Sequence, residues 1–429
     1  MNKIIYPKRE AWELLLLRPV LNVDTLRDTV NEVIARVQQL GDKALFGYEA
    51  RFDHVQLEQL AVTEAELTEA EELVPINLKA AILLAAKNIE TFHKAQRFVT
   101  QKVETMSGVT CWQKAVPIEK VGLYVPGGTA PLFSTVLMLA TPARIAGCKE
   151  IVLCTPPNHE GKVHPAILYA AKVAGVHRIF KVGGAQAIAA MAHGTETIPK
   201  VYKIFGPGNQ YVMAAKQQVS LHEVAIDMPA GPSEVAVLAD ETASPVCVAA
   251  DLLSQAEHGV DSQAMLVTTS SKLLDEVEYE VQRQLALLPR WQIAEKSISH
   301  SKLILVKDLD EAVDMVNAYA PEHLIIQTEN YMQVAERIEN AGSVFLGAYS
   351  TESAGDYASG TNHTLPTHGY AKAYSGVSLD SFIRKITFQE ITEDGLQTLG
   401  PVIEVLAEHE ELDAHKRAVS VRLKQIAKK

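Results

Sequence analysis

The sequence predicts an α/β protein of two doubly wound domains, with helical arms at both ends of the chain. Short apolar runs of strand type alternate with helical runs from about residue 121 onward, and this pattern is typical of parallel sheets covered by helices on both faces. The alternation begins again after residue 233, which indicates a second sheet. The two halves share no visible sequence identity, so a duplication is only a hypothesis.

The N-terminal part of the chain is predicted to be helical. From 23 to 40, apolar residues recur in steps of three and four, as on one face of an amphipathic helix, and Gly41 is a C-terminal stop signal. A second helix is expected at about 77–96, after Pro75. The first alternating set follows, with strands at 121–125, 150–154, 178–182 and 201–204, and helices at 133–146, 166–174, 185–192 and 211–219.

The second alternating set is expected to have strands at 234–238, 264–268, 303–306, 323–327 and 343–346. From residue 399 the chain is helical and ends in a cluster of Lys and Arg. We therefore divide the chain into an N-terminal arm (1–25), a first α/β domain (26–120 and 234–375), a second α/β domain (121–233) and a C-terminal helical arm (376–429). Arms that cannot bury their apolar faces alone often pack on a second subunit.

The composition excludes several classes of protein. The chain has 429 residues, 47% of them hydrophobic, and a formal net charge of −12, which is ordinary for a soluble globular protein. An acidic chain has no electrostatic attraction for nucleic acid or for an anionic membrane surface. The apolar run at 14–17 is too short for a signal peptide, and the four cysteines form no CxxC pair. We therefore expect a cytoplasmic protein that binds neither nucleic acid nor membrane.

Four glycine-rich turns follow predicted strands, at 125–128, 182–186, 205–209 and 229–233. Such turns at strand ends let backbone N–H groups approach a ligand. The nearest approach to a dinucleotide fingerprint is Gly206-Pro-Gly208, but Tyr211 stands where the third glycine belongs. One such turn alone is more often a simple tight connection. Four of them favour a ligand-binding rim.

A second group of residues has the chemistry of metal ligands. Gln255 and His258 lie at i, i+3 near the end of a predicted helix, on one face. A polar, glycine-rich loop follows at 355–368, and a segment rich in Glu and His lies at 408–415. Imidazole, carboxylate and amide groups can all bind Zn²⁺, although an amide is unusual. On spacing alone, ordinary core or surface histidines are the more common interpretation.

Glu322 and His323 open a predicted strand, directly after Pro321. An adjacent carboxylate and imidazole can act as general bases, because their pKa values are readily tuned toward neutrality. Neighbouring strand residues point to opposite faces, so both reach one site only if the Pro-Glu-His turn lies outside the regular strand. The alternative is a polar pair at the edge of a strand.

Seven segments, in order along the chain, share a family resemblance. They are Val121-Gly-Leu-Tyr-Val-Pro-Gly-Gly, Ala185-Gln-Ala-Ile-Ala, Phe205-Gly-Pro-Gly-Asn, Asp227-Met-Pro-Ala-Gly-Pro-Ser-Glu, Leu252-Leu-Ser-Gln-Ala-Glu-His-Gly, Ala320-Pro-Glu-His-Leu and the loop 355–368. Together they resemble the L-histidinol dehydrogenase family over nearly the whole chain. The resemblance implies two incomplete Rossmann-like domains and a homodimer with one Zn²⁺ per subunit. It also implies two NAD-dependent steps that oxidise L-histidinol to L-histidine through a bound aldehyde, at the end of histidine biosynthesis.

The resemblance also implies roles for individual residues. The metal ligands would be Gln255, His258, Asp356 and His415, the last supplied by the partner subunit through the C-terminal arm. The catalytic pair would be Glu322 and His323. Substrate contacts are expected at Ser233, His363 and Glu410, besides the metal ligands and His323. NAD contacts are expected at Tyr124, Gln186 and Asn209.

Glu410 needs a geometric comment. It lies five residues before His415, so on one helix the two side chains would be separated by roughly 140°. Glu411, at i, i+4 from His415, would face the same side. Asp413 is a good N-cap, however, so the last helix can begin there and leave Glu410 in the preceding turn. We follow the family pattern and expect Glu410 to contact substrate.

The expected chemistry divides between two residues. His323 is predicted to take the alcohol proton and to act again in the second oxidation, while Glu322 activates water against the aldehyde. No cysteine occurs in the motifs, which disfavours a thiohemiacetal route. Three alternatives stay open: a related zinc and NAD dehydrogenase for another polar alcohol, a zinc hydrolase that uses Glu322 or Glu257, and a non-catalytic two-lobed binding protein.

Overall fold

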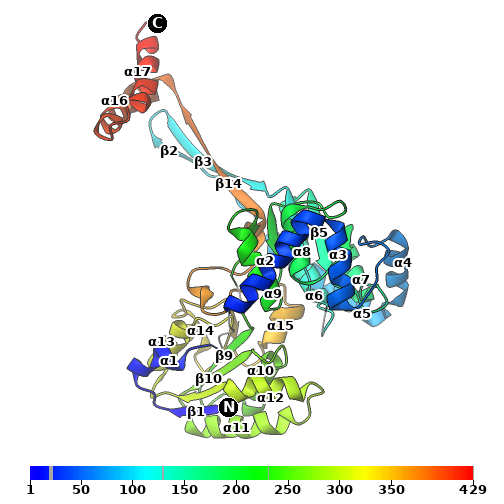
Figure 1. The fold of residues 1–429 in the computed structure, drawn as a ribbon. Helices are drawn as coiled ribbons and strands as arrows, with labels where there is room; N and C mark the ends of the chain where they lie inside the picture. The colour runs from blue at the N-terminus through cyan, green and yellow to red at the C-terminus, as the bar shows by residue number, and fades with distance from the viewer. Residues whose placement is uncertain (19–22, 128–129, 230, 429) are drawn as a thin grey trace. The chain divides into compact units, whose positions relative to one another are not determined.

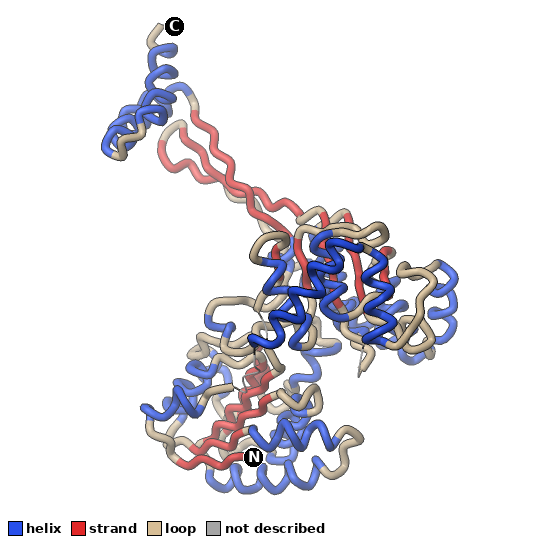
Figure 2. The backbone as a smooth tube through the Cα atoms, viewed as in Figure 1, coloured by secondary structure: helices blue, strands red, loops and turns tan. Residues whose placement is uncertain are grey.

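The computed structural model describes residues 1–18, 23–127, 130–229 and 231–428, with the backbone only at 23–25. The chain forms two compact units, the first of Met1–Gln96 and Ile118–Phe382, the second of Arg97–Pro117 and Ile383–Lys429. Figures 1 and 2 show strands and helices intermixed along the chain. The predicted α/β class is confirmed.

One sheet of the first unit has five strands within the described residues, all parallel, in the order β6-β5-β4-β7-β8. Its strands are β4 (Lys120–Tyr124), β5 (Glu150–Thr155), β6 (Arg178–Lys181), β7 (Lys203–Phe205) and β8 (Ala225–Ile226). The helices between them are α6 (Phe133–Ala146), α7 (Pro165–Ala174), α8 (Gly184–His193) and α9 (Gln210–Ser220). All were predicted except β8, whose two residues are too few to show a pattern.

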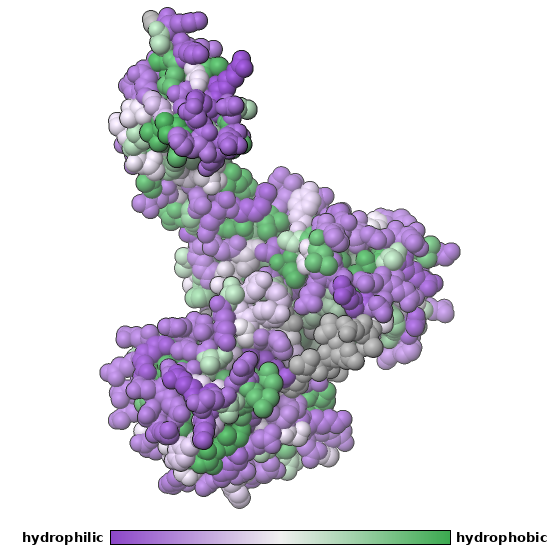
Figure 3. Space-filling model, turned by 60° about the vertical axis from the view of Figure 1, so that its left-hand side comes forward, coloured by the Kyte–Doolittle hydropathy of each residue, from purple (hydrophilic) through white to green (hydrophobic). Residues whose placement is uncertain are grey.

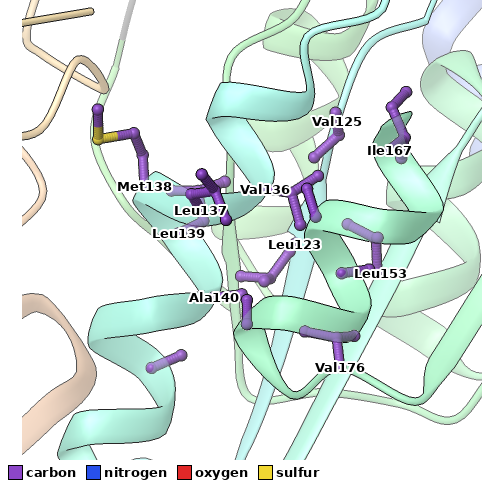
Figure 4. Packing of buried hydrophobic residues seen from close by; sticks show 14 of the residues in the cluster. Leu123, Val125, Val136, Leu137, Met138, Leu139, Ala140, Leu153, Ile167 and Val176 are labelled. Atoms are coloured by element: carbon purple, nitrogen blue, oxygen red, sulfur yellow. The ribbon is translucent and has the colours of Figure 1, made fainter. Parts of the chain in front are cut away.

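The core of this five-stranded sheet follows the alternation of side chains along a strand. Leu123 of β4 lies in one apolar cluster with α6 and α7, where Leu137, Leu153 and Ile167 surround it (Figure 4). Its neighbour Tyr124 lies in a separate cluster on the other face, with α8. Both faces are therefore buried, as expected for a parallel sheet.

The other sheet of the first unit has six described strands, all parallel, in the order β1-β11-β10-β9-β12-β13. The strands are β1 (Asn2–Ile5), β9 (Glu234–Ala239), β10 (Gln263–Thr268), β11 (Lys302–Leu305), β12 (His323–Gln327) and β13 (Ser343–Leu346). The helices are α10 (Pro245–Ala256), α11 (Ser271–Leu285), α12 (Trp291–His300), α13 (Leu309–Tyr319), α14 (Tyr331–Ala335) and α15 (Glu352–Tyr357). Apart from β1, both sheets place their strands in the same order, with the first strand of each set at the centre.

The division of the N-terminal region differs from the prediction. The region 26–120 was assigned to the domain of 234–375, but its helices pack on the five-stranded sheet. These helices are α2 (Val23–Leu40), α3 (Asp42–Tyr48), α4 (Glu64–Leu73) and α5 (Ile76–Lys94). Val30 lies in a cluster with Ile188, and Ile82 in one with Val121. Periodicity shows which helix face is buried, but it does not show which sheet covers that face.

The predicted N-terminal arm is partly a strand. Residues 2–5 form β1 and pair in parallel with β11, from Asn2 opposite Lys302 to Ile5 opposite Leu305. Helix α1 (Trp12–Leu15) and the 3-10 turn η1 (Arg9–Ala11) follow. Trp12 is buried against the six-stranded sheet. A four-residue strand next to charged residues has no local signal, because its partner lies about 300 residues away.

The second unit combines a three-stranded antiparallel sheet and a helical pair. The strands are β2 (Lys102–Met106), β3 (Val109–Pro117) and β14 (Ile383–Ile391), and the helices are α16 (Glu393–His409) and α17 (Asp413–Ile426). The predicted C-terminal arm therefore begins with a strand, β14, which pairs with β3 along its whole length. In α16, Gly400 faces Leu423 of α17 so closely that an added Cβ would lie 2.9 Å from it.

Short helical turns complete the described chain: η2 (Glu49–Asp53), η3 (Tyr370–Lys372) and η4 (Leu379–Phe382). In the part of the chain that the structure describes, no helix combines the length and apolar character needed to span a membrane.

Candidate active site

Glu322 and His323 lie where α13 turns into β12. Ala320 ends α13 with φ of +52°, and the regular strand begins only at His323. Glu322 therefore lies outside the strand, as required for the two side chains to meet, and its Oε2 is 3.7 Å from Nδ1 of His323. Both residues are buried.

The first residue of β9 contacts both members of this pair. The backbone N–H of Glu234 donates to Oε2 of Glu322 at 2.9 Å. The backbone oxygen of Glu234 lies 3.3 Å from Nδ1 of His323. Because β9 and β12 are paired in parallel, Glu322 and His323 lie at the N-terminal edge of the six-stranded sheet. Glu234 was not expected at the site, because its local pattern is that of an ordinary strand start.

Burial changes the charge states of this cluster. Burial raises the pKa of the Glu322 carboxyl to about 8, although the neighbouring imidazole of His323 opposes the shift. Burial alone would lower the pKa of His323, but the surrounding carboxylates, Glu322 first, raise it above its ordinary value. Burial and the neighbouring charges thus shift the pKa values of both groups, as is common at functional sites.

Gln255, His258 and Asp356 come from two helices that end near His323. Gln255 lies in the last turn of α10, His258 just after it, and Asp356 in α15. Asp251 of α10 links the helices, because its carboxylate accepts hydrogen bonds from Oγ1 of Thr351 at 2.9 Å and Nε2 of Gln327 at 3.0 Å. Thr351 is the N-cap of α15.

Polar atoms in this cluster lack partners. Oε1 of Gln255, Oδ1 of Asp356 and Nε2 of His323 are buried, and none has a hydrogen-bond partner among the described residues. Nε2 of His323 lies 3.3 Å from Oδ1 of Asp356. Buried polar atoms are rarely left unsatisfied, and an amide oxygen, a carboxylate and an imidazole together suit a divalent cation such as Zn²⁺. The donor set therefore fits the metal that the sequence suggested.

Glu352 belongs to the same cluster and was not expected. One ligand atom each from His258, Glu352 and Asp356 lies within 4.8 Å of the others. The Glu352 side chain is buried, and burial raises its pKa to about 8. Its spacing of four residues from Asp356 places both on one face of α15. Because no helix was predicted there, the sequence did not indicate that the two carboxylates share a face.

Ser233 and His363 lie near the pair. Nδ1 of His363 is 2.8 Å from the backbone oxygen of Asp356, and Nε2 is 3.0 Å from Oγ1 of Thr135. Ser233 immediately precedes β9 and is half-buried. Both residues line one cavity with Glu322 and His258.

This cavity has a volume of about 620 Å³ and lies within the first unit. Its wall includes Gly206, Gly208 and Asn209 of the glycine-rich turn after β7. Strands β4 and β7 are adjacent. At this point the chain leaves β4 toward β5 on one side and leaves β7 toward β8 on the other side. The crevice beyond the carboxyl ends of such strands is the usual ligand site of a doubly wound sheet. One cavity thus extends from the glycine-rich turn after β7 to Glu322.

The three expected NAD contacts lie in different surroundings. Asn209 is exposed at the cavity and caps α9, because its Oδ1 accepts from the N–H groups of Tyr211 and Val212. Tyr124 is buried, and its hydroxyl accepts a hydrogen bond from the N–H of Gly184 at 3.1 Å. Gln186 is also buried, and its Nε2 donates to Oε1 of Glu49 at 3.0 Å. Tyr124 and Gln186 do not line the cavity as it is described.

Glu410 and His415 belong to the second unit, where both are exposed. Glu410 is the C-cap of α16, and α17 begins at Asp413. The turn between them contains Glu411 at φ of +58°. The expected break of the helix before His415 is therefore present, but Leu412 rather than Asp413 is the N-cap. Within their own unit these side chains have no described metal-ligating neighbours.

The fold and the cluster on the cavity wall fit an α/β oxidoreductase. Comparison with known proteins defines the family more closely. The family model of histidinol dehydrogenase matches residues 16–423. The chain is 72% identical over 428 residues to a histidinol dehydrogenase of Bacteroides fragilis, covering 100% of both chains. It is 71% identical over 423 residues to one of Bacteroides thetaiotaomicron, covering 99% of both.

A solved structure supports the same assignment. The crystal structure of histidinol dehydrogenase from Elizabethkingia anophelis is 54% identical and superposes with a TM-score of 0.98, over 100% of this chain and 99% of that one. The chain belongs to the histidinol dehydrogenase family.

Proposed function

We propose that this protein oxidises L-histidinol to L-histidine, the last steps of histidine biosynthesis, with NAD as electron acceptor and one Zn²⁺ per subunit. Membership of the family supports the substrate. The single structural observation behind the proposal is the cavity with Glu322 and His258 on its wall beside the turn of Gly206 and Gly208. A biosynthetic enzyme of this kind would act in the cytoplasm, on a small molecule, without nucleic acid or membrane as partner.

Gln255, His258 and Asp356 would hold the zinc, together with His415 from a second copy of the chain. Oε1 of Gln255 and Oδ1 of Asp356 are buried without hydrogen-bond partners among the described residues, and a ligand atom of His258 lies within 4.8 Å of one of Asp356, which supports this assignment. When bound, zinc would orient the substrate by contact with the nitrogen atoms of the substrate, and NAD would accept the two hydrides. Tyr124, Gln186 and Asn209 would contact NAD, of which Asn209 lies on the cavity wall.

His323 would move the protons of the alcohol and of the aldehyde hydrate. Its Nδ1 faces the backbone oxygen of Glu234 at 3.3 Å, so Nε2 is the nitrogen left to accept a proton. Nε2 is buried, has no hydrogen-bond partner among the described residues and lies 3.3 Å from Oδ1 of Asp356. The imidazole is therefore oriented for proton transfer at one defined atom.

Glu322 would activate the water that is added between the two oxidations. One of its oxygens, Oε2, is held by the N–H of Glu234, which leaves the other free to accept a proton from water. Its raised pKa makes it a stronger base than an ordinary carboxylate. Ser233, His363 and Glu410 would hold the substrate.

A thiol route through Cys154 or Cys148 has no support. Cys154 is buried in the core, where burial raises its pKa well above the ordinary value, and burial raises the pKa of Cys148 to about 12. Neither side chain would form a thiolate near neutral pH.

Stoichiometry tests the proposed function. Oxidation of a primary alcohol to a carboxylate removes four electrons, so we expect two NADH for each L-histidinol consumed and L-histidine as the product. The measurement is absorbance of NADH combined with chromatographic quantification of histidine. One NADH per substrate with aldehyde as the final product, or no turnover of L-histidinol, would refute the proposal.

We further propose a homodimer with shared active sites. Several large apolar side chains are exposed on the helical pair of the second unit: Val402, Val405, Leu406 and Leu412. Hydrophobic surface is visible among the polar residues of this helical pair in Figure 3. Apolar helix surface of this kind suits contact with another subunit.

Mixing two inactive variants tests the sharing. His415→Ala and Glu322→Gln homodimers are each expected to lose the formation of L-histidine, the second because its aldehyde step is slowed, so L-histidine is the product to measure. A heterodimer isolated with two different tags should regain activity in one of its two sites. That site would combine the intact Glu322 of the His415→Ala subunit with the intact C-terminal arm of the Glu322→Gln subunit. If each arm served its own subunit, both sites of the heterodimer would stay defective and no activity would return. A pair of His415→Ala and Glu410→Ala, both in the arm, is the matched control and should not complement.

A further inference from the structure

Arg18 belongs to the N-terminal segment and lies behind Glu234, the residue whose backbone contacts Glu322 and His323. Its Nε donates to Oε1 of Glu234 at 2.6 Å, and an Nη group donates to Oε2 at 2.8 Å. The two side chains are 12% and 3% exposed, respectively. A planar fork that meets both carboxylate oxygens is the most directional ion pair available to a protein. The pair therefore holds Glu234 in one position.

Glu234 passes this constraint to both members of the catalytic pair. Its N–H donates to Glu322 and its backbone oxygen faces Nδ1 of His323. Its carboxylate also accepts a hydrogen bond from the N–H of His368 at 2.6 Å, and this residue ends the loop that contains His363. A displacement of Glu234 would thus move the partners of Glu322 and His323 together.

Arg18 also holds the turn before Glu322. It donates to the backbone oxygen of Tyr319 at 2.6 Å, and its guanidinium stacks 4.0 Å from the centre of the Tyr319 ring. The next residue, Ala320, has a left-handed backbone, which is unfavourable for an L-residue other than glycine. Such a conformation persists only where its surroundings impose it, and the contact of Arg18 with Tyr319 is one of those constraints.

We propose that Arg18 is a positioning residue for histidinol oxidation, acting through Glu234 on both Glu322 and His323. This inference rests on the proposed roles of those two residues. Arg18 does not line the cavity that contains Glu322, so it would affect turnover rather than substrate binding. Without Arg18, the buried Glu234 carboxylate would lose its counter-charge and move or take up water, which displaces both catalytic partners.

Steady-state kinetics of the full-length holoenzyme test the proposal. Arg18→Gln is expected to lower kcat by about 10- to 100-fold with little change in KM, because misplacement by a fraction of an ångström affects chemistry more than binding. Arg18→Lys keeps the charge but not the fork, so its kcat should be intermediate. Arg9→Gln is the matched control, because Arg9 lies in the same segment in an exposed ion pair with Asp314, and its kcat should be unchanged.

A double-mutant cycle separates positioning from general stability. Glu234→Gln leaves Arg18 unpaired, whereas Arg18→Gln with Glu234→Gln leaves neither charge unpaired. The two losses in kcat should therefore not add, and the double variant should be no slower than the slower single variant. Zinc content and thermal unfolding are measured for every variant, so that kcat refers to folded, loaded protein. Should Arg18→Gln not fold, the kcat of Arg18→Lys decides the question.

Two outcomes would overturn the proposal: a kcat of Arg18→Gln and Arg18→Lys equal to that of Arg9→Gln, or a change confined to KM. Glu322→Gln and His323→Asn are assayed in parallel. If these two variants turn over normally, the proposed function of the pair fails. If they are impaired while the Arg18 variants are not, only the present inference fails.

Discussion

Replacing His323 with Asn is expected to abolish both oxidation steps while leaving the protein folded. Nδ1 of His323 faces the backbone oxygen of Glu234, and Nε2 is buried near Oδ1 of Asp356 without a hydrogen-bond partner among the described residues. Asn can replace the first contact but has no atom that takes a proton near neutral pH. A positioned general base contributes about 10²- to 10⁴-fold, so kcat should fall by at least that range with L-histidinol and with the aldehyde alike. The exposed His159 offers a control substitution, His159→Asn, that should have no effect.

Glu322→Gln should separate the two steps. Its amide can still accept the N–H of Glu234, but it cannot take a proton from water. Oxidation of L-histidinol to the aldehyde is therefore expected to continue, while oxidation of the aldehyde slows by about 10²-fold or more. Single-turnover NADH formation from each substrate measures the two steps. Equal loss of both would contradict the proposed division between Glu322 and His323.

Removal of the metal is the second change with a large expected effect. Chelation should abolish turnover, and added Zn²⁺ should restore it, because buried oxygen atoms of Gln255 and Asp356 have no hydrogen-bond partners among the described residues and His258 lies close enough to Asp356 to share a cation. Asp356→Asn removes the charged ligand, so bound zinc, measured by elemental analysis after dialysis, should fall well below one per subunit. Loss of a first ligand lowers affinity by at least the roughly 10- to 100-fold typical of outer contacts.

Glu257→Gln is the control for this loss. Glu257 is a half-buried carboxylate next to His258 in sequence, but it lies outside the cluster of His258, Glu352 and Asp356. Its substitution should leave zinc content and turnover intact. Full zinc content in Asp356→Asn would refute the assignment of Asp356. Loss of turnover in Glu257→Gln with zinc retained would instead favour a hydrolase-type role for that residue.

Periodicity predicted the strands and helices well where both faces of the element are buried. The runs at 121–125 and 234–238 became β4 and β9 almost unchanged, because a continuous apolar run between turn residues has few other ways to bury itself. It failed for β1 and β14, whose residues are largely exposed. These strands exist because of backbone pairing with β11 and β3, and backbone pairing does not appear in the side-chain pattern.

Short motifs named candidate residues of the site, but they did not predict how these residues are arranged in space. Glu322, His323, His258 and Asp356 were named from sequence, and the structure places them near one another. Gln255, also named, lies in the last turn of α10 just before His258. Glu352 was not named, because nothing in a polar loop indicates that a short helix there turns a glutamate inward. Two of the three expected NAD contacts do not line the cavity. Tyr124 is hydrogen-bonded to Gly184 and Gln186 to Glu49, and both side chains are buried.

The sequence by itself determined the α/β class, the two alternating sets, the family and the candidate site residues, because each of these follows from local periodicity or from short motifs. Only the tertiary structure decided which sheet the N-terminal helices cover, and that Arg18 meets Glu234 beside Glu322 and His323. The reason is physical: Arg18 and Glu234 are 216 residues apart, and their contact exists only after β9, α13 and the N-terminal segment have packed. A local sequence pattern can indicate that a side chain is buried or needs an opposite charge. Which distant residue provides that contact depends on the tertiary structure.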